Sequence, residues 1–286
     1  MAKHYEIEPV TRIEGHAKIT CVVSDEGNVE QARFHVVEFR GFEKFCEGRH
    51  FSEMPTLTER ICGICPVSHH LASAKAIDIL ANTKPTRTAA LLRELMHMGQ
   101  MFQSHALSFF HLSSPDLLLG PDSDPALRNV VGLAQNFPDA TVAAVKARKW
   151  GQEIIAAIGG RKIHPNCAVP GGMAAGISRE RGAELLSEKS AHLDTILLGI
   201  DLLMDWCKKN PEVVQKFARF FSYYGGLVSP KGELELYDGD FRVTDPHGKV
   251  AVDQFNPQDY LNIIGERVES WTTLKFPYYK PAGYPD

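Results

Sequence analysis

The feature that most constrains the fold of this chain is a long middle region with helical periodicity. From residue 56 to residue 225, apolar side chains recur at spacings of three, four or seven residues, which places them on one face of a helix. Two such stripes are Leu91, Leu95, Met98, Phe102 and Phe109, and Leu193, Ile196, Ile200 and Leu203. We expect both stripes to pack in the core, so the region predicts a bundle of long helices.

The two ends of the chain have a different pattern. Residues 17–23 alternate apolar and polar side chains, residues 25–28 form a turn, and residues 32–39 resume the alternation, which predicts a β-hairpin. Residues 226–275 contain short runs separated by turns, and residues 276–286 predict an extended loop rather than the end of a domain. We therefore predict a mainly α fold of the α+β class. Its three parts are an N-terminal β layer (1–55), a helical bundle (56–225) and a small β region (226–286).

Composition and charge argue against several classes of function. The chain has 286 residues and a net charge of −4, with no basic stripe, so we expect no nucleic-acid partner. It contains no window of about 18 apolar residues, so we expect no helix that crosses a membrane. Residues 1–16 are charged throughout and have no apolar core, which predicts no secretory signal and favours a cytoplasmic location.

The sharpest chemical feature is a pair of cysteines, Cys62 and Cys65, directly before Pro66. Proline is favoured at the first position of a helix, and residues 71–80 are strongly helical. We therefore expect both thiols at a helix N-terminus, where the dipole and unpaired amides favour thiolate. Spacing alone leaves four alternatives open: half of a structural zinc site, a thioredoxin-like redox pair, half of another thiolate metal site, or coincidence.

The surroundings of these cysteines resemble the large, nickel-binding subunit of [NiFe] hydrogenases. The stretch from Arg60 to His69 is similar to the family's first cysteine motif, RxCGxCxxxH, at every specified position. Further segments resemble family motifs in the right order: residues 11–16 (TRIEGH), 40–43 (RGFE), 159–165 (GGRKIHP) and 170–172 (PGG). Residues 109–116 (FFHLSSPD) look most like the cytoplasmic, bidirectional branch, which passes electrons to nicotinamide or a related soluble carrier.

The resemblance implies an enzyme, a hydrogenase that oxidises H2 reversibly at a centre of nickel and iron. In the family, four cysteine thiolates hold the nickel, and two of them bridge to an iron that carries CO and cyanide ligands. By resemblance, Cys62 is a terminal nickel ligand and Cys65 bridges nickel and iron. Soft thiolates suit this task because they stabilise several oxidation states of nickel. Arg60 adds a positive charge beside them.

The same resemblance assigns roles to three further side chains. Glu14 matches the proton-relay glutamate, which carries a proton outward if burial draws its pKa toward neutrality. Glu43 matches a carboxylate that helps to bind a magnesium or iron ion at the far end of the buried site. His69 matches a histidine that donates a hydrogen bond toward the bridging sulfur. Without the resemblance, both glutamates are more typical of solvated surface charges, and His69 of a helix cap.

One family motif is missing from the sequence, namely the second cysteine pair, DPCxxCxxH. The chain therefore predicts half of the metal site. We expect either a truncated product or a subunit whose remainder is a separate chain, and favour truncation. The alternative function is a truncated or non-catalytic subunit of a redox complex that lacks a complete metal site. The quinone-binding large subunit of respiratory complex I is similar in fold but lacks the cysteines, so intact Cys62 and Cys65 argue against it.

The other cysteines match no family ligand, and we expect them to be buried small apolar residues: Cys21, Cys46, Cys167 and Cys207. The chain thus offers no cysteine cluster for iron–sulfur relays. We expect those clusters only in a partner, the iron–sulfur small subunit. A diaphorase or another electron-transfer module would complete the complex.

Overall fold

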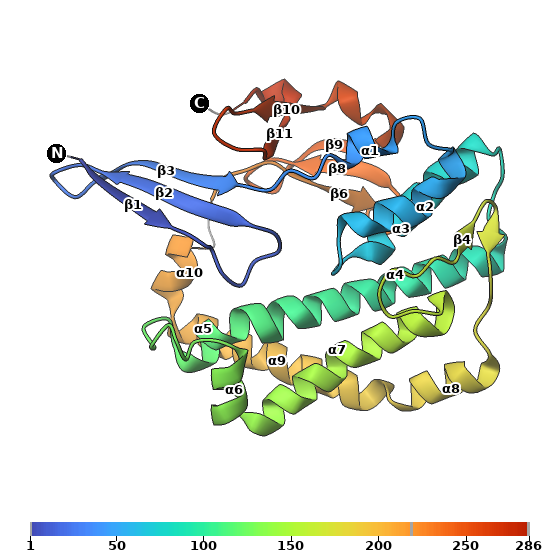
Figure 1. Ribbon diagram of the computed structural model, residues 1–286, viewed down its shortest axis with the longest axis horizontal. Helices are drawn as coiled ribbons and strands as arrows, with labels where there is room; N and C mark the ends of the chain where they lie inside the picture. The colour runs from blue at the N-terminus through green and yellow to red at the C-terminus, as the bar shows by residue number, and fades with distance from the viewer. Residues whose placement is uncertain (1, 218–219, 285–286) are drawn as a thin grey trace. The chain divides into compact units, whose positions relative to one another are not determined.

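The computed structural model describes residues 2–217 and 220–284, which form two compact units. The first unit combines the two ends of the chain, residues 1–40 and 218–286, and the second contains residues 41–217. Small antiparallel sheets and long helices confirm the predicted α+β class (Figure 1). No helix among the described residues is long and apolar enough to cross a bilayer.

The N-terminal sheet of the first unit has three antiparallel strands in the order β1-β2-β3: β1 (Lys3–Ile7), β2 (Ala17–Val23) and β3 (Val29–Val36). The turn between β2 and β3 is closed by a bond of 2.8 Å from the Ser24 amide to the Asn28 carbonyl. Gly27 adopts a φ of 87° there, which glycine tolerates without strain. The predicted hairpin is confirmed.

The C-terminal part of the first unit forms two further sheets. One has the order β7-β6-β8-β9, and the other pairs β10 with β11. Their bounds are β6 (Tyr224–Val228), β7 (Leu234–Glu235), β8 (Asp240–Thr244), β9 (Val250–Phe255), β10 (Ile264–Val268) and β11 (Lys275–Tyr279). Short 3-10 helices follow β9 and β11 as η4 (Pro257–Asn262) and η5 (Lys280–Ala282).

Two sequence predictions are corrected in this part. Residues 275–279 form β11, so the loop predicted from residue 276 is wrong for its first part. Pairing with β10 supplies backbone partners that the sequence does not reveal. The helical region predicted to reach residue 225 is also too long, because the last described α-helix ends at Phe217 and β6 begins at Tyr224. Residues 218–219 and 285–286 lie outside the described residues.

Side-chain bonds join the two ends of the chain within the first unit. The Thr272 hydroxyl accepts a bond of 3.0 Å from the Val36 amide, and the His35 ring lies 2.9 Å from the Trp271 carbonyl. Arg33 also stacks over the Trp271 ring at 5.2 Å. These contacts explain why distant parts of the sequence form one unit.

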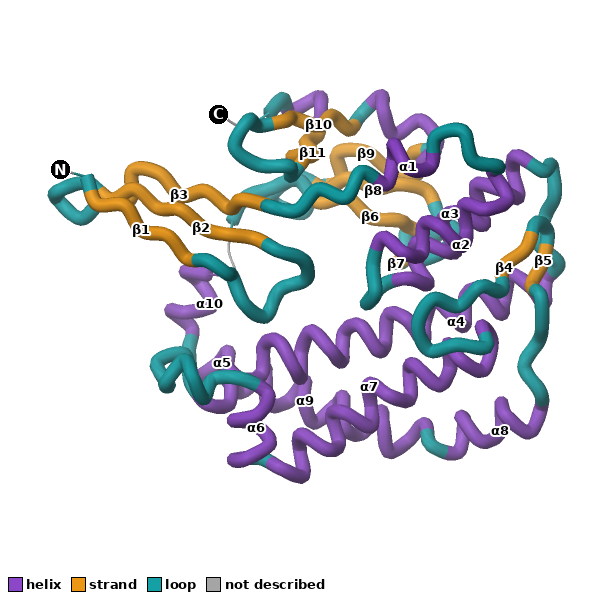
Figure 2. Tube along the Cα trace, in the orientation of Figure 1, coloured by secondary structure: helices purple, strands orange, loops and turns teal. Residues whose placement is uncertain are grey.

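The second unit consists mainly of helices (Figure 2). They are α1 (Phe42–Cys46), η1 (Phe51–Glu53), α2 (Met54–Thr58), η2 (Glu59–Ile61), α3 (Pro66–Leu80), α4 (Arg87–Leu107), the π-helical turn η3 (Ser108–Ser113), α5 (Ser114–Leu119), α6 (Val130–Asn136), α7 (Pro138–Gly159), α8 (Arg179–Ser187), α9 (Lys189–Lys209) and α10 (Pro211–Phe217). A short hairpin of β4 (Ala168–Val169) and β5 (Gly172–Met173) follows α7.

Local chemistry explains where α4 begins and where α7 begins and ends. The Thr86 hydroxyl caps α4 by accepting a bond of 3.2 Å from the Ala89 amide. Pro138 occupies the first turn of α7, and Gly160 ends that helix in the left-handed region at a φ of 73°. Each of these signals comes from a residue at the helix end itself.

Helices α4 and α7 approach each other closely at two glycines. A Cβ added to Gly99 would lie 2.9 Å from Cγ2 of Ile154, and one added to Gly151 would lie 2.9 Å from the backbone nitrogen of Gln103. Alanine at either position therefore forces the helices apart. The buried face of α4 follows from this contact: Ala89, Leu92, Arg93, Met96, Gly99, Gln100, Gln103 and Ala106.

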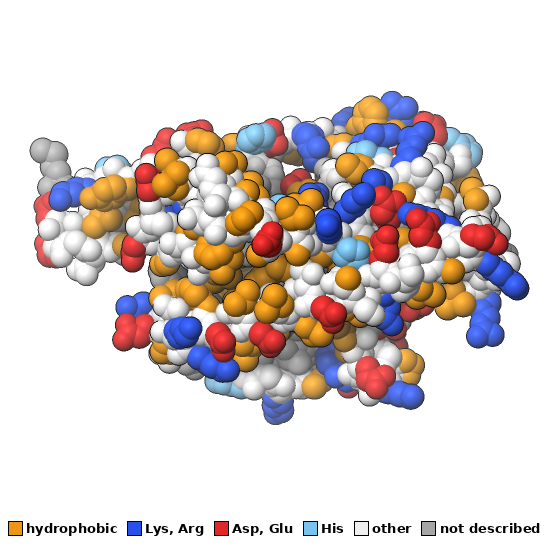
Figure 3. Space-filling view, turned by 90° about the horizontal axis from the view of Figure 1, so that it is seen from below, with side chains coloured by type: hydrophobic (Ala, Val, Ile, Leu, Met, Phe, Trp, Pro, Cys, Tyr) orange, Lys and Arg blue, Asp and Glu red, His pale blue; other side chains and the backbone are white. Residues whose placement is uncertain are grey.

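The two predicted apolar stripes are not the core faces of their helices. Leu91 is 55% exposed and Leu95 is 43% exposed on α4, and on α9 Ile200 is 49% exposed. The remaining stripe residues lie at or near the surface, and only Gly199 of α9 is buried. The prediction is wrong because the glycine contact selects a different face of α4. The face drawn in Figure 3 likewise carries hydrophobic side chains between charged ones.

Candidate metal centre

The cysteine loop lies between the 3-10 helix η2 and the first residue of α3. Cys62 is extended, with φ −141° and ψ 130°, and Cys65 is the N-cap residue of α3, with Pro66 in the first turn. The predicted placement of the pair at a helix N-terminus is confirmed. The Cys65 amide donates a bond of 3.1 Å to the Cys62 sulfur. Such a donor stabilises a thiolate more than a thiol.

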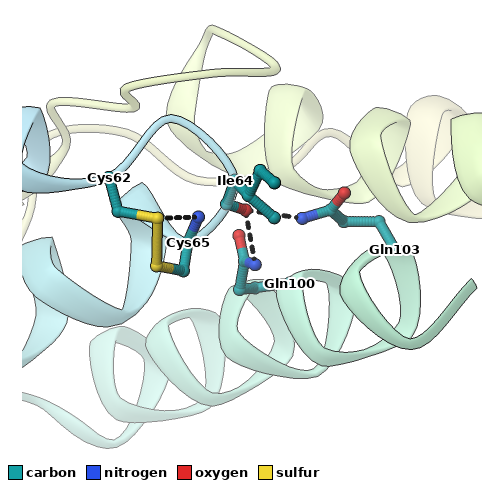
Figure 4. The surroundings of a disulfide bond; sticks show 5 residues. All are labelled: Cys62, Ile64, Cys65, Gln100 and Gln103. Carbon is teal, nitrogen blue, oxygen red and sulfur yellow. Dashed lines mark hydrogen bonds between the residues drawn. A yellow bond between two sulfur atoms is a disulfide. The ribbon is translucent and has the colours of Figure 1, made fainter. Parts of the chain in front are cut away.

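Two glutamines of α4 hold this loop in place. The Ile64 carbonyl accepts a bond of 2.8 Å from Nε2 of Gln100 and one of 2.9 Å from Nε2 of Gln103 (Figure 4). Both glutamines are at most 4% exposed. Sequence reasoning missed them, although two glutamines three residues apart on one helix face would have been a usable signal.

Cys62, Cys65 and His69 lie close together. One potential ligand atom from each lies within 4.8 Å of the others, and all three residues are half-buried. The structure records the two cysteines as a disulfide, with Cα atoms 5.4 Å apart. A metal ion needs two thiolates, so reduction must precede metal binding. Three residues named from the sequence are thus brought together.

The His69 backbone is fixed, while its ring makes no hydrogen bond to any described group. Its carbonyl accepts a bond of 3.3 Å from the Thr58 hydroxyl, which also donates to the Met54 carbonyl at 2.8 Å. Burial lowers the pKa of the ring. The neutral imidazole is the form that binds metals.

Another cysteine, Cys167, lies near the next histidine in the chain, His70, but in a different environment. Cys167 is 4% exposed, and burial and then the charge of Glu59 raise its pKa to about 11. His70 is fully buried: Nδ1 lies 3.0 Å from the Pro55 carbonyl, and Nε2 accepts from the Cys167 and Ala168 amides at 3.3 and 3.0 Å. These partners fix the proton on Nδ1, which makes His70 a structural residue.

The expectation of four buried cysteines holds for Cys167 alone. Cys21, Cys46 and Cys207 are half-exposed. Cys21 is on a strand of a small sheet, and the other two are on helices with few buried residues. A three-stranded sheet or a single surface helix cannot cover every apolar side chain that it carries.

Glu59 is a buried carboxyl group that the sequence did not single out. It is 0% exposed, and its two carboxylate oxygens accept no hydrogen bond from the described residues. Nε of Arg60 lies 3.7 Å from Oε1, but the Arg60 side chain is 51% exposed. Burial raises the pKa of Glu59 to about 7, although the charges of Arg60 and Arg161 oppose the shift. Glu59 therefore binds a proton in the neutral range.

The two glutamates predicted from the resemblance are exposed. Glu14 lies in the first unit, in the loop before β2, so the burial expected for a relay carboxylate is not found there. Glu43 lies in the first turn of α1 in the second unit. Among the described residues, neither belongs to the cluster of potential metal ligands.

The PGG segment is held by a buried ion pair. Arg93 of α4 contacts Asp78 of α3 at 2.5 Å and donates to the Val169 and Gly172 carbonyls at 2.9 Å each. Asp78 also accepts a bond of 2.8 Å from the Gly171 amide. This network fixes the β4–β5 hairpin against the helix that carries the cysteine loop.

Comparison with known proteins places the chain among hydrogenases. A model described as nickel-dependent hydrogenase matches residues 40–119, and one described as HoxL-like matches residues 5–39. A vhu subunit of the F420-non-reducing hydrogenase from Methanocaldococcus jannaschii is 42% identical over 280 residues, which are 98% of this chain and 66% of that protein. The beta subunit of the NAD-reducing hydrogenase HoxS from Cupriavidus necator is 41% identical, over 99% of this chain and 60% of that protein.

Solved structures agree with these relatives. An NAD+-reducing [NiFe]-hydrogenase in the H2-reduced state matches with a TM-score of 0.96 and 44% identity, over 99% of this chain and 63% of that one. A Ni-Fe-Se hydrogenase from D. vulgaris Hildenborough matches with a TM-score of 0.77 and 26% identity, over 98% of this chain and 64% of that one. The chain therefore spans about three-fifths to two-thirds of the proteins that it matches.

Proposed function

Because the chain belongs to the nickel-dependent hydrogenase family, we propose that it serves as the cysteine-bearing N-terminal part of a [NiFe] hydrogenase large subunit. The proposed activity is the reversible oxidation of H2 to protons and electrons. The observation that carries it is the convergence of Cys62 and Cys65 at the start of α3, beside a neutral imidazole. The family resemblance of the sequence motifs is confirmed.

The residues present fit one half of a nickel and iron centre. Cys62 would hold nickel as a terminal ligand, and Cys65 would bridge nickel and iron. Thiolates are the soft ligands that nickel and iron prefer, and the Cys65 amide favours thiolate at Cys62. When bound, such a centre supplies the Lewis acidity that polarises H2. CO and cyanide ligands on the iron belong to the same proposal.

Further side chains would move charge or orient ligands around that centre. Glu14 would carry a proton away from the site, and Glu43 would help to bind a magnesium or iron ion. His69 would donate a hydrogen bond toward the Cys65 sulfur in the complete four-thiolate site. Arg60, half-exposed beside the loop, would offset the negative charge of the thiolates. The chemistry of these side chains and their family motifs support these roles.

Electrons would leave through a partner protein. The cysteines outside the loop are scattered over different elements, Cys21, Cys46, Cys167 and Cys207, so they offer no iron–sulfur site. The proposed partner is an iron–sulfur small subunit, with a diaphorase or another electron-transfer module beyond it. The similarity to NAD-reducing hydrogenases supports a heteromeric, cytoplasmic complex with a soluble electron carrier.

A metal analysis of the complete protein with its partner subunits tests the proposal. Cys62→Ser is expected to remove nickel and H2-dependent dye reduction together, because one nickel ligand is lost. Cys207→Ser, on α9, is the matched control and should keep both. Retention of nickel and turnover in Cys62→Ser would refute the ligand assignment. A wild-type complex without nickel and without turnover would support a non-catalytic subunit instead.

A further inference from the structure

We propose that a cavity in the second unit binds a small ligand with an apolar body and a carboxylate head, of the size and chemistry of a medium-chain fatty acid. The cavity has a volume of about 220 Å³ and lies between η3, α5, the first turn of α7 and the second half of α9. In Figure 1, α5 lies beside α9. The lining residues fall between residues 109 and 209, outside the cysteine loop, so the proposal goes beyond the proposed function and does not depend on it.

Two aromatic rings of the π-helical turn η3 line the cavity. The turn lies between α4 and α5 and brings Phe109 and Phe110 against α9. Their rings meet edge to face, with centroids 4.9 Å apart. A Cβ added to Gly199 would lie 2.9 Å from Phe109 and 3.0 Å from Phe110, so α9 admits both rings because this residue is glycine. π-helical turns are rare and occur frequently at functional sites, so this one is a second sign of a binding site.

The other walls of the cavity are also apolar. On α9, Gly199, Leu203 and Trp206 are spaced by four and three residues, so they lie on one face of that helix, and α5 contributes Leu117 to the lining. An apolar cavity of about 150 Å³ holds benzene, and on this scale 220 Å³ admits an apolar body of about eight carbon atoms. Transfer of each methylene from water into such a cavity is favourable, which gives the site affinity for an alkyl chain.

A lysine at the rim supplies a positive charge for the head group. Lys209, the last residue of α9, lines the cavity and forms no ion pair with a described residue. Asp205 also lines it, but its carboxylate lies 3.5 Å from the Lys208 ammonium, which leaves the three side chains with a net positive charge. The dipole at the end of α9 opposes an anion with only about half a unit charge.

The apolar lining of the cavity reaches solvent, so a ligand can enter. Leu118 is 37% exposed and Leu202 is 47% exposed, and both line the cavity. An amphiphile therefore fits with its chain among the aromatic and leucine side chains and its carboxylate at the mouth, beside Lys209. Such an arrangement, an apolar pocket with few polar groups that fix the orientation of the ligand, is typical of small-molecule sites.

Isothermal titration calorimetry of the full chain with a series of carboxylates tests the size of the site. From butanoate to octanoate, the affinity should rise about fourfold for each added methylene. It should level off by dodecanoate, whose chain is longer than the cavity admits. If octanoate shows no saturable binding below its micelle concentration, the proposal is overturned. An affinity that keeps rising through dodecanoate also overturns it, because that result indicates adsorption on exposed apolar surface.

The charge of the head group is tested at Lys209. Octanoate should bind about two- to fivefold more tightly than octanol, which is the range of an exposed ion pair. Lys209→Glu should reverse the preference, so that octylammonium binds more tightly than octanoate. Lys189→Glu makes the same change of charge at the opposite end of α9 and should leave the order unchanged. Equal affinities for the three head groups in the wild-type chain would rule out recognition of a carboxylate.

The position of the ligand is tested by filling the cavity. Ala140 is exposed in the first turn of α7 and lines the cavity, so Ala140→Phe should take the space of about two methylenes and lower the octanoate affinity about tenfold. Ala134→Phe, on the exposed side of α6, is the control and should bind as wild type does. Unchanged affinity in Ala140→Phe places the ligand elsewhere and overturns the proposal.

Trp206 gives a signal from inside the cavity. Octanoate should change the tryptophan fluorescence of the wild-type chain, and this change should be absent in Trp206→Phe. A change that survives in Trp206→Phe would come from Trp150 or Trp271 and would contradict the assigned position. The chain-length series needs no variant, so the test stays decisive if a variant folds poorly.

Discussion

Two neighbouring groups of cysteine and histidine in the second unit contrast sharply. The first is Cys62, Cys65 and His69 at the start of α3, and the second is Cys167 with His70. His69 and His70 are consecutive residues of one helix, so their side chains project about 100° apart. One histidine turns toward the cysteine loop, and the other turns into the core.

The two groups differ in solvent exposure and in whether the histidine ring has hydrogen-bond partners. Cys62 and Cys65 are half-exposed beside an imidazole without partners among the described residues. Cys167 is buried, and its neighbour His70 is fully hydrogen-bonded. Residue type therefore does not mark the reactive group. The reactive pair is instead distinguished by partial exposure and by an adjacent imidazole whose ring bonds to no described residue.

The largest expected effect is on thiol alkylation. In the reduced, metal-free chain at pH 7.5, a pKa of about 11 leaves roughly 1 in 3,000 of the Cys167 groups as thiolate. Cys167 is also buried, so we expect Cys62 and Cys65 to react with iodoacetamide at least about 100-fold faster. Peptide mass spectrometry over time measures the ratio. Equal rates would remove the contrast between the two groups.

The next effect is on stability, and it separates the two histidines. His70→Ala removes a buried ring and leaves the Pro55 carbonyl and the Cys167 and Ala168 amides without their partner. We expect a loss of about 4 kcal/mol in the free energy of unfolding. His69→Ala should change it by less than about 0.5 kcal/mol.

Urea unfolding of the reduced, metal-free chain measures both changes under the same conditions. Removing the metal matters because a bound ligand stabilises the folded state and would mask the small effect at His69. Similar losses in both variants would show that His69 is also a structural residue.

Sequence reasoning succeeded where local chemistry decides the structure. The hairpin around residues 25–28 and the start of α3 at Pro66 both depend on residues within a few positions. The same applies to the cysteine pair at a helix N-terminus. Such signals survive in any tertiary context, because their partners are neighbours in the chain.

The sequence did not reveal features of packing that depend on residues far away in the chain. The stripe of Leu91 and Leu95 has perfect helical spacing, yet Gly99 and Gly151 turn another face of α4 toward α7. The burial of Glu59 and the opposite roles of His69 and His70 depend on packing in the same way. Periodicity shows that a helix has an apolar face, but does not show which face the neighbouring helix selects.

The next effect is on the pH dependence of stability and comes from Glu59, whose charge also raises the pKa of Cys167. Its pKa is raised from 4.5 in the unfolded chain to about 7 in the folded one, because burial disfavours the carboxylate. The folded protein therefore holds a proton that the unfolded chain releases between these values. The stabilisation is full below pH 4.5 and is lost as the pH rises through 7. The total is about 3 kcal/mol.

Glu59→Gln should remove this pH dependence, since the amide does not ionise. Relative to wild type, the variant should gain about 2.5 kcal/mol between pH 5 and pH 8, measured by urea unfolding at each pH. The exposed Glu94 on α4 offers a matched control, and Glu94→Gln should track wild type. A difference between Glu59→Gln and wild type that stays constant with pH would show that Glu59 is ionised throughout.

The smallest expected effect tests how the cysteine loop is held. Gln100 and Gln103 both donate to the Ile64 carbonyl, so either one alone still satisfies it. Replacing one by methionine should cost about 1 kcal/mol. Replacing both should cost about 1 kcal/mol more than the sum, because the carbonyl then has no donor. Urea unfolding of the two single variants and the double variant gives this coupling, with Gln135→Met on the exposed side of α6 as control. Strictly additive losses would mean that the loop finds another donor, and that α4 does not set the position of the metal-binding sulfurs.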